Sequence, residues 1–240
     1  MTTVLITGAN RGLGLEFARQ YQAEGASVIA CCRDLRKADA LKQQSVEIAE
    51  LDVTDAESIH RLAVQLKGRP LDILINNAGT YGPDRQSADD CDYQGMVETF
   101  RINAVAPLMV AKALKPNLLA GQGKKLAVLT SKMGSISDSS GGFLAYRASK
   151  AALNMIADGV TKEWRKDGIA VAILHPGWVQ TDMGGPNAPI KPQESVKGLR
   201  ARIAELSLTA SGRFVDFQGR EIGWERRRSQ AAASMRKKGT

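Results

Sequence analysis

Short apolar runs alternate with longer amphipathic segments along most of this 240-residue chain. The short runs are rich in Val, Ile, Leu and Ala, which is typical of strands that are buried on both faces of a parallel sheet. Right-handed crossovers through the intervening helices then produce a doubly wound parallel sheet. We therefore expect a single α/β domain with about seven strands flanked by helices. The strands are expected at 3–7, 27–32, 46–51, 71–79, 125–131, 169–177 and 212–217.

Helical patterns fill the spaces between these strands. Asp55 is expected to cap one helix, and Gly25 is expected to end another. The helix that Gly25 ends is expected at 12–25, and the remaining patterns predict helices at 34–44, 92–115 and 143–166. No linker divides the chain, so one domain should cover 1–224, followed by a basic tail at 225–240.

The net charge of +8 is concentrated at the C-terminal end. The tail at 225–240 contains six Lys or Arg residues and one Glu. We interpret it as a solvated, poorly ordered terminus. Contact with nucleic acid or an acidic membrane is the alternative, but the tail lacks the interleaved aromatic residues or groove-reading motif that would support it. Nucleic acid is therefore not an expected partner.

The three cysteines do not form the pattern of a disulfide framework. Cys31 and Cys32 are adjacent and are expected to pack as small apolar groups, and an odd number of cysteines favours a reducing compartment. No cysteine has a His partner at metal-ligand spacing, so no metal is expected. No apolar run reaches the ~18 residues of a membrane span, and no signal peptide is evident. We therefore expect a cytoplasmic protein.

The first strand runs directly into a glycine-rich turn, "TGANRGLG" at 7–14. Gly8, Gly12 and Gly14 suit a tight turn and a close approach of the backbone to a pyrophosphate, and the next helix aims its N-terminus at that anion. Glycine runs alone are weak evidence, but a turn between a strand and a helix is the context that this motif requires. We therefore predict a dinucleotide site on a Rossmann-type fold.

The end of the second strand indicates which dinucleotide is preferred. A site for NAD usually has an acid there that binds the ribose hydroxyls, but the sequence "CCRD" places Cys32 at that position, followed by Arg33. Arg33, together with Arg11 in the glycine turn, can bind a 2′-phosphate. This favours NADP(H) over NAD(H). In the alternative, Arg33 is a surface residue and Asp34 binds the ribose.

Tyr146 and Lys150 lie four residues apart in the helix expected at 143–166, so both project from one face. An ammonium group favours the phenolate and should lower the pKa of the tyrosine from about 10. A tyrosine with such a pKa can pass a proton at neutral pH. The Y-x-x-x-K pattern alone arises often by chance, and its plain interpretation is a surface Tyr beside a solvated Lys.

Further motifs occur in order along the chain. They are "LDVTD" at 51–55, "NNAG" at 76–79, Asn103 in "RINAVAP", Ser131 in "LTSKMGSI" and "PGWVQT" at 176–181. Together with the glycine turn and the Tyr–Lys pair, these motifs resemble the short-chain dehydrogenase/reductase family over nearly the whole chain. The stretches "SKMGSI" and "SGRFVDFQGREIGW" are similar to its C-factor-type and sniffer-type carbonyl reductases.

The resemblance implies a role for each matching residue. Tyr146 would protonate the carbonyl oxygen as hydride arrives, and Ser131 would hydrogen-bond the same oxygen. Lys150 would hold the nicotinamide ribose and lower the pKa of Tyr146, and Asn103 would support a water and proton relay to Lys150. Asp52 would meet the adenine amino group. The residues expected to bind the cofactor are Gly8, Asn10, Arg11, Gly12, Leu13, Gly14, Arg33, Asp52, Val53, Asn77, Ala78, Gly79, Tyr146, Lys150, Pro176, Gly177, Val179 and Thr181.

Plainer interpretations of single residues stay open. Ser135 or Ser137 could take the role of Ser131, and Asn103 could simply cap or kink its helix. His175 is expected to support its loop rather than to act in catalysis. The Gly/Pro-rich segment at 182–195 reads as a connecting loop, and a mobile loop beyond a strand end is also a good lid.

We expect an NADPH-dependent oxidoreductase that transfers hydride between nicotinamide and a carbonyl or alcohol substrate. The residues that select this small molecule should lie at 80–95 and 182–200, whose sequences contain no motif that identifies the substrate. The resemblance implies a homodimer or homotetramer formed through the helices at 92–115 and 143–166. The alternative is a dinucleotide-binding signalling or regulatory protein of the C-factor type with little turnover, against which the intact set of four catalytic positions argues.

Overall fold

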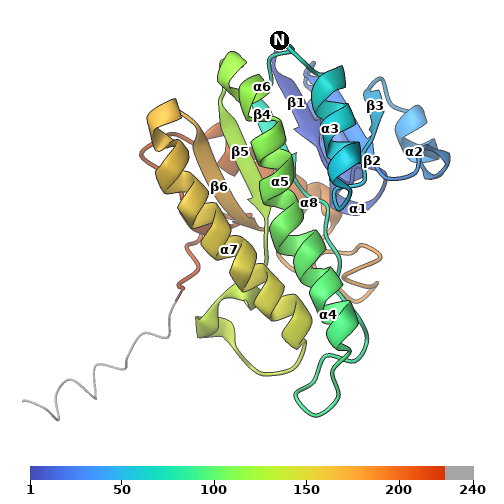
Figure 1. The fold of residues 1–240 in the computed structure, drawn as a ribbon, viewed down its shortest axis with the longest axis vertical. Helices are drawn as coiled ribbons and strands as arrows, with labels where there is room; N and C mark the ends of the chain where they lie inside the picture. Colours follow the sequence, from blue (N-terminus) through green and yellow to red (C-terminus); the bar gives the residue numbers. More distant parts are fainter. Residues whose placement is uncertain (225–240) are drawn as a thin grey trace, which may run out of the picture.

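The computed structural model describes residues 1–224, and the predicted tail at 225–240 lies outside the described residues. Seven parallel strands form one sheet in the order β3-β2-β1-β4-β5-β6-β7, with helices on both faces (Figure 1). This confirms the doubly wound parallel sheet. The strands are β1 (Thr3–Ile6), β2 (Ser27–Cys32), β3 (Glu47–Glu50), β4 (Ile73–Asn76), β5 (Lys125–Leu129), β6 (Ala170–His175) and β7 (Phe214–Asp216).

Successive strand residues pack into different layers. Leu5 lies in a buried cluster with side chains of α3 (Ala56–Gln65), α5 (Ala106–Ala113) and α7 (Leu144–Trp164). Its neighbours Val4 and Ile6 lie in a second cluster with α1 (Gly12–Ala23) and α8 (Pro192–Ala204). Side chains alternate across a strand, so a sheet covered on both faces needs apolar residues at every position. This explains the continuous apolar runs in the sequence.

The adjacent cysteines follow the same alternation. Cys31 belongs to the cluster under α3, α5 and α7, whereas Cys32 belongs to the cluster under α1 and α8. Both thiols are free and almost fully buried. They pack as small apolar groups, as expected.

Two predicted helices are interrupted. The range 34–44 holds a 3₁₀ turn at Leu35–Lys37 and the short α2 (Asp39–Lys42). The range 92–115 holds α4 (Tyr93–Phe100), a π-helical segment at Arg101–Val105 and then α5, after which α6 (Lys115–Ala120) follows. Single π turns inside a helix are frequent at functional sites.

Helix α8 was not predicted, because its sequence was read as part of the loop at 182–200. The segment is largely polar and contains Gly198, and both features weaken a helical pattern. The structure explains the glycine, since a Cβ there would lie 2.4 Å from the carbonyl oxygen of Phe217. Helix α8 packs against α1 and completes the second layer.

The predicted cap at Asp55 is confirmed, because its carboxylate accepts hydrogen bonds from the backbone N–H groups of Glu57 and Ser58. Within residues 1–224, no helix combines the length and the apolar character needed to cross a membrane.

Candidate active site

The carboxyl ends of β1 and β4 are joined by Asn77. Its backbone N–H donates to Oγ1 of Thr7 at 3.0 Å, and its Nδ2 donates to the carbonyl oxygens of Thr7 and Gly8 at 2.8 and 3.0 Å. The glycine turn and the NNAG motif, about 70 residues apart, therefore form one structural unit. In open α/β sheets, ligands bind outside the carboxyl ends of the strands, where this unit lies.

The three glycines of the turn are each required for a steric reason, and the reason differs between them. Gly8 and Gly12 have φ angles of 63° and 55°, in the left-handed region that favours glycine. Gly14 has an ordinary helical backbone, but a Cβ there would lie 2.3 Å from the carbonyl oxygen of Gly8. The third glycine therefore allows the close contact between α1 and the turn.

The N-terminus of α1 fits an anion. Among residues 1–224, no side chain caps this helix and no acid lies in its first turn. The first N–H groups of a helix have no partner within the helix, and the helix dipole places positive charge there. This is the arrangement that receives a pyrophosphate, so these residues fit the expected dinucleotide.

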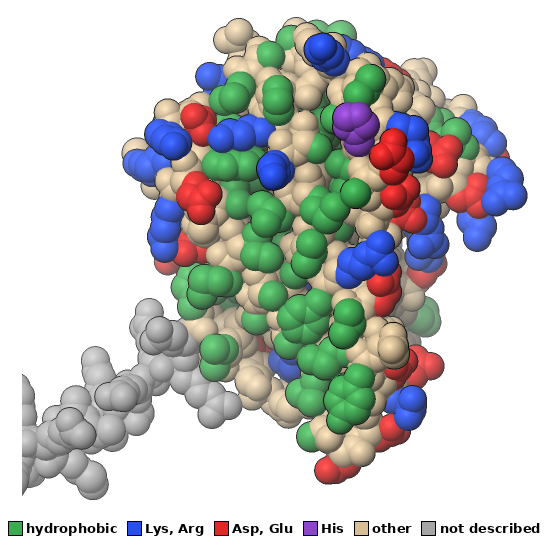
Figure 2. Space-filling view, in the orientation of Figure 1, with side chains coloured by type: hydrophobic (Ala, Val, Ile, Leu, Met, Phe, Trp, Pro, Cys, Tyr) green, Lys and Arg blue, Asp and Glu red, His purple; other side chains and the backbone are tan. Residues whose placement is uncertain are grey.

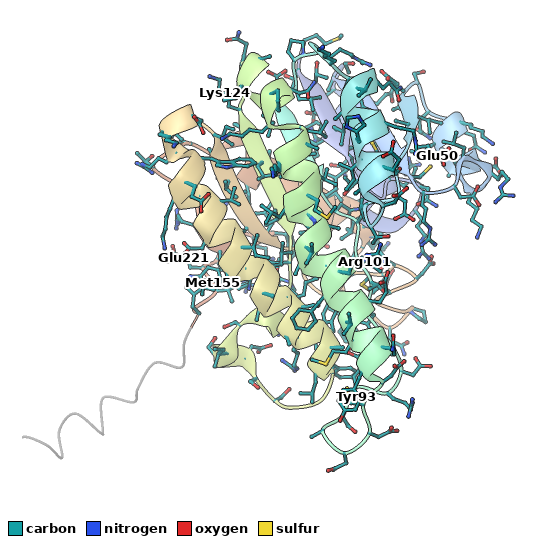
Figure 3. All side chains as sticks on the ribbon, viewed as in Figure 1. Glu50, Tyr93, Arg101, Lys124, Met155 and Glu221 are labelled. Atoms are coloured by element: carbon teal, nitrogen blue, oxygen red, sulfur yellow. The ribbon has the colours of Figure 1, made fainter. Side chains whose placement is uncertain are left out.

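A surface cavity of about 450 Å³ lies at the ends of β2 and β3. Its lining consists of Arg33, Asp34, Leu35, Arg36 and Glu50, the last of which is labelled in Figure 3. Arg36 donates to both carboxylate oxygens of Asp34, at 2.9 and 3.1 Å. The carboxylate that could bind a ribose is thus already paired, whereas Arg33 lines the same cavity.

Arg11 does not lie in this cavity lining. Its Nη1 forms an ion pair with Oδ2 of Asp182 at 2.7 Å, and both side chains are exposed. The structure therefore pairs Arg11 with Asp182, whereas Arg33 lines the cavity. Arg11 instead connects the glycine turn to the segment that follows β6.

Asp52 and Val53 follow β3. Oδ1 of Asp52 accepts hydrogen bonds from the backbone N–H and the hydroxyl of Thr54, at 2.9 and 2.7 Å. Partial burial raises the pKa of Asp52, but these hydrogen bonds and the charges of Arg33 and Arg101 outweigh it and hold the pKa below its usual value. Asp52 is thus an ionised acceptor near the cavity, as contact with an adenine amino group would require.

Tyr146 and Lys150 lie in the first two turns of α7 and are 8% and 6% exposed. Nζ of Lys150 lies 5.9 Å from the centre of the Tyr146 ring and donates to the carbonyl oxygen of Leu129 at 2.9 Å. The hydroxyl of Ser131, just beyond β5, lies close enough to the Tyr146 phenol to oppose the rise of its pKa. The structure therefore brings these three side chains together at the end of β5.

Burial controls the pKa values of this pair. It raises the pKa of Tyr146 to about 12; the hydroxyl of Ser131 acts in the opposite direction, and Tyr81 adds to the rise. Burial also lowers the pKa of Lys150 to about 8. The expectation that Lys150 lowers the pKa of Tyr146 is therefore wrong for these two side chains. Removing both groups from water disfavours both charged forms, and this outweighs their attraction.

Asn103 lies in the π-helical segment and is completely buried. Its Oδ1 accepts from the backbone N–H of Thr80 at 2.9 Å, and its Nδ2 donates to the carbonyl oxygen of Thr80 at 2.8 Å and to Oγ of Ser149 at 3.0 Å. A Cβ on Gly79 would lie 3.1 Å from Oδ1 of Asn103 and 3.6 Å from Nζ of Lys150. Gly79 thus marks the place where the NNAG motif, Asn103 and Lys150 meet.

The segment after β6 folds back toward the glycine turn. Gly177 has a φ of 85°, and a Cβ there would lie 2.4 Å from Cδ1 of Ile190. Val179 is buried and pairs with Ile190 in a short parallel bridge. A Cβ on Gly12 would lie 3.5 Å from Cγ2 of Thr181. The PGWVQT motif and the glycine turn therefore face each other.

The alternative serines have other partners. The hydroxyls of Ser135 and Ser137 lie 2.7 Å apart, and both donate to the carbonyl oxygen of Gly223. Ser131 is therefore the serine that lies beside Tyr146.

His175 is buried, and burial and then the charge of Lys132 lower its pKa to about 4.

Sequence reasoning missed two residues next to Tyr146. The ring of Tyr81 lies 4.8 Å from the Tyr146 ring, centre to centre. Gln86 is buried, and its Oε1 accepts from the backbone N–H of Tyr146 at 2.9 Å. Both lie in the polar, turn-rich stretch at 80–92, whose sequence has no periodicity that would mark a buried side chain.

The model of the short-chain dehydrogenase family matches residues 2–190. The C-signal protein of Myxococcus xanthus is 47% identical over 156 residues, which cover 65% of this chain and 93% of that protein. Two solved structures are similar over 93% of this chain. An NADPH-bound carbonyl reductase from chicken fatty liver has a TM-score of 0.86 and 35% identity, with 99% of its chain covered.

The second structure is the carbonyl reductase Sniffer of D. melanogaster, which has a TM-score of 0.85 and 32% identity, with 100% of its chain covered. The order of the motifs, the seven-stranded sheet and these similarities agree with one another. The chain belongs to the short-chain dehydrogenase family, within its C-factor-like and sniffer-like group.

Proposed function

We propose that this protein is an NADPH-dependent carbonyl reductase with Tyr146 as its general acid. The observation that carries the proposal is the convergence of Tyr146, Ser131 and Lys150 at the end of β5, close to the NNAG motif. A carbonyl that gains hydride develops negative charge on its oxygen, and donors already aimed at that oxygen stabilise the charge. A tyrosine and a serine held side by side are suitable donors.

NADPH would supply the hydride when it is bound. The glycine turn and the N-terminus of α1 would hold its pyrophosphate, and the NNAG motif and the segment from Pro176 to Thr181 would line its path. Tyr146 would give its proton to the carbonyl oxygen, and Ser131 would donate a hydrogen bond to the same atom. Tyr146 is protonated at neutral pH, because its pKa is about 12. It can therefore act as an acid. Lys150, whose Nζ lies 5.9 Å from the centre of the Tyr146 ring, would return the proton, and Asn103 would support a water relay to Lys150.

The preference for NADP(H) is supported by charge. Arg33 lines the cavity at the end of β2, and Arg36 neutralises Asp34 there. A 2′-phosphate would meet Arg33 and Arg36 there, whereas Asp34 is already paired and Glu50 is the second carboxylate of the lining. The chicken enzyme, which is similar to this chain, is described as NADPH-bound. We expect Arg33→Ala to raise the KM for NADPH about 10-fold or more while changing the KM for NADH little, because a charge-assisted hydrogen bond contributes about 1.5–3 kcal/mol.

A homodimer would cover the apolar face of α4, α5 and α7. Figure 2 shows hydrophobic side chains gathered on this face. Tyr93, Val97 and Met155 are 75%, 69% and 72% exposed, and Tyr93 and Met155 are labelled in Figure 3. Contiguous exposed apolar residues mark interaction surfaces.

The free thiols at 31, 32 and 91 suit a reducing compartment, so we propose that the protein acts in the cytoplasm.

The direct test is oxidation of NADPH and of NADH in the presence of a panel of aldehydes and ketones. Tyr146→Phe should abolish turnover without weakening NADPH binding strongly. Tyr21→Phe is the matched control, because Tyr21 is also buried with a pKa raised to about 12, but it packs beside α8 on the other side of the sheet. Turnover that survives Tyr146→Phe, or a protein that binds NADPH but reduces no carbonyl, would contradict the proposal.

A further inference from the structure

Gln86 makes four hydrogen bonds around the start of α7. Its Oε1 accepts from the backbone N–H of Tyr146 and its carbonyl oxygen accepts from the N–H of Leu144, both at 2.9 Å. Its Nε2 donates to the carbonyl oxygens of Tyr81, at 3.0 Å, and of Pro83. The residue is 4% exposed, so water does not replace these partners. One amide therefore connects Tyr146 to the loop that follows β4.

Helix α7 depends on this connection because it has no local cap. Its N-cap residue, Phe143, has a φ of 49° and offers no side-chain acceptor. A bulky residue in the left-handed region is strained, and the first N–H groups of a helix need acceptors from elsewhere. Gln86 supplies two of them, to Leu144 and Tyr146, from about 60 residues away in the sequence. Tyr146 belongs to this first turn, so whatever fixes the turn also fixes the phenol.

The hydrogen bonds of Gln86 complete a ring that passes through the proposed catalytic residues. Asn103 donates to Oγ of Ser149, and that hydroxyl donates to the carbonyl oxygen of Tyr146 at 2.8 Å. Tyr146 donates to Gln86, and Gln86 donates to Tyr81. Asn103 also binds the backbone of Thr80, the neighbour of Tyr81, which closes the ring. Gln86 is the member of this ring that ties Tyr146 to the loop.

Aromatic contacts follow the same path. The ring of Tyr81 lies 4.8 Å from the ring of Tyr146 and 5.3 Å from the ring of Phe143, at angles of 35° and 59°. Offset and tilted aromatic pairs at such distances are attractive. Gln86 holds the backbone of Tyr81, so it places this ring against Tyr146 as well as holding Tyr146 itself.

We propose that Gln86 is a positioning residue that sets the place of the Tyr146 phenol relative to Ser131, Lys150 and the ring of Tyr81. The inference rests on the proposed function, in which Tyr146 is the acid. A structural role alone would make Gln86 matter for folding and nothing else. A positioning role requires that its loss change the chemistry at Tyr146 in protein that is still folded.

The first test compares Gln86→Met with Asn117→Leu. The second change removes another buried amide that donates to two backbone carbonyl oxygens, those of Leu66 and Arg69 at 2.6 and 2.8 Å, at the opposite end of the sheet. Both variants should lose thermal stability. Only Gln86→Met should lower kcat, by about 10- to 100-fold, with the Kd for NADPH unchanged, because small misplacements of a catalytic group cost that much. Equal kcat values in the two variants and the wild type would overturn the proposal.

The second test is Gln86→Glu, which also covers the outcome that Gln86→Met does not fold. A protonated carboxyl keeps one donor and one acceptor, whereas the ionised form loses the donor for the carbonyl oxygens of Tyr81 and Pro83. The charged groups of the adjoining hairpin, Arg85 and Asp90, pair with each other at 3.0 Å. A protonated carboxyl in this variant can replace only one of the two hydrogen bonds that the Gln86 amide donates, and the ionised form can replace neither. The ratio of variant to wild-type kcat should therefore be highest at low pH and fall as pH rises. A ratio independent of pH would overturn the proposal.

A readout that does not need turnover separates this inference from the proposed function. With tyrosine labelled at Cζ, the NMR resonance missing in Tyr146→Phe identifies the phenol and reports its titration. Gln86→Met or Gln86→Glu should shift this resonance, and Asn117→Leu should leave it unchanged. If the wild type reduces no carbonyl but the resonance shifts, the proposed function fails and the positioning role stands. An unshifted resonance in both Gln86 variants would refute the positioning role.

Discussion

Replacing Gly14 with alanine should damage both the fold and the cofactor site. The new Cβ would lie 2.3 Å from the carbonyl oxygen of Gly8, 2.6 Å from Nδ2 of Asn77 and 2.9 Å from Cα of Ala9. Two of these three atoms belong to the backbone, so the turn itself has to move. Inserting a methyl group into such a space costs about 1–3 kcal/mol.

The hydrogen bonds of Asn77 add to this cost. Its Nδ2 donates to Thr7 and Gly8, and each bond contributes about 1 kcal/mol. Helix propensity returns about 1 kcal/mol when glycine becomes alanine. We therefore expect Gly14→Ala to lower the free energy of unfolding by about 2–4 kcal/mol. It should also weaken NADPH binding, because we propose that this turn holds the pyrophosphate.

Gly159→Ala is the matched control for this prediction. Gly159 also lies in a helix, α7, but a Cβ there would meet nothing within 4 Å. Urea unfolding should show it to be neutral or up to about 1 kcal/mol more stable than the wild type. A fluorescence titration with NADPH should show an unchanged Kd for Gly159→Ala and a raised one for Gly14→Ala. Equal stability and equal Kd for both variants would refute the steric argument.

Three further predictions concern charge and surface. Lys150→Met should stabilise the ligand-free fold at pH 7 while abolishing activity. Burial lowers the pKa of Lys150 from its usual 10.5 to about 8, so its charged form opposes folding below pH 8, and this penalty fades as pH rises to 10.5. Urea unfolding midpoints of the variant and the wild type at pH 7 and 10.5 measure the effect. Asp72→Ala should lower the free energy of unfolding by about 1–3 kcal/mol at neutral pH, because the carboxylate accepts from the N–H groups of Thr3, Gln122 and Gly123. Partial burial raises the pKa of Asp72, but these bonds outweigh it and hold the pKa below its usual value. The destabilisation should therefore shrink as pH falls through the range in which the carboxyl group becomes protonated. Val97→Asp should lower the mass measured by light scattering if α4 pairs with a second copy, and an unchanged oligomeric mass would place the interface elsewhere.

The strands and the glycine turn could be predicted because their signals are local. The apolar runs, the glycine pattern and the cap at Asp55 each depend on residues that are only a few positions apart in the sequence. The parallel, doubly wound sheet followed from the alternation of strands and helices, whereas the strand order β3-β2-β1-β4-β5-β6-β7 was not predicted. Helix α8 was missed because Gly198 looks like a helix breaker in the sequence. The glycine is required by the close approach of the carbonyl oxygen of Phe217, which is 19 residues away in the sequence.

The site was predictable in its residues but not in its electrostatics. Tyr146 and Lys150 lie close together, and Asn103 and Lys150 both lie near Gly79, but the pKa of Tyr146 rises rather than falls. Their catalytic roles stay a prediction. Desolvation depends on how much of the fold surrounds a group, and the four-residue spacing says nothing about that. Gln86 was unpredictable for a related reason, since its partners on α7 are about 60 residues away.

The most direct test of the central claim is isotope transfer from NADPH deuterated at C4 of the nicotinamide. The account predicts that the wild type moves the deuterium to the former carbonyl carbon of an aldehyde or ketone, with one NADP⁺ formed per alcohol. Tyr146→Phe should transfer none, whereas Tyr21→Phe should transfer as much as the wild type. Deuterium transfer by Tyr146→Phe at the wild-type rate, or no transfer by the wild type to any carbonyl despite NADPH binding, would contradict it.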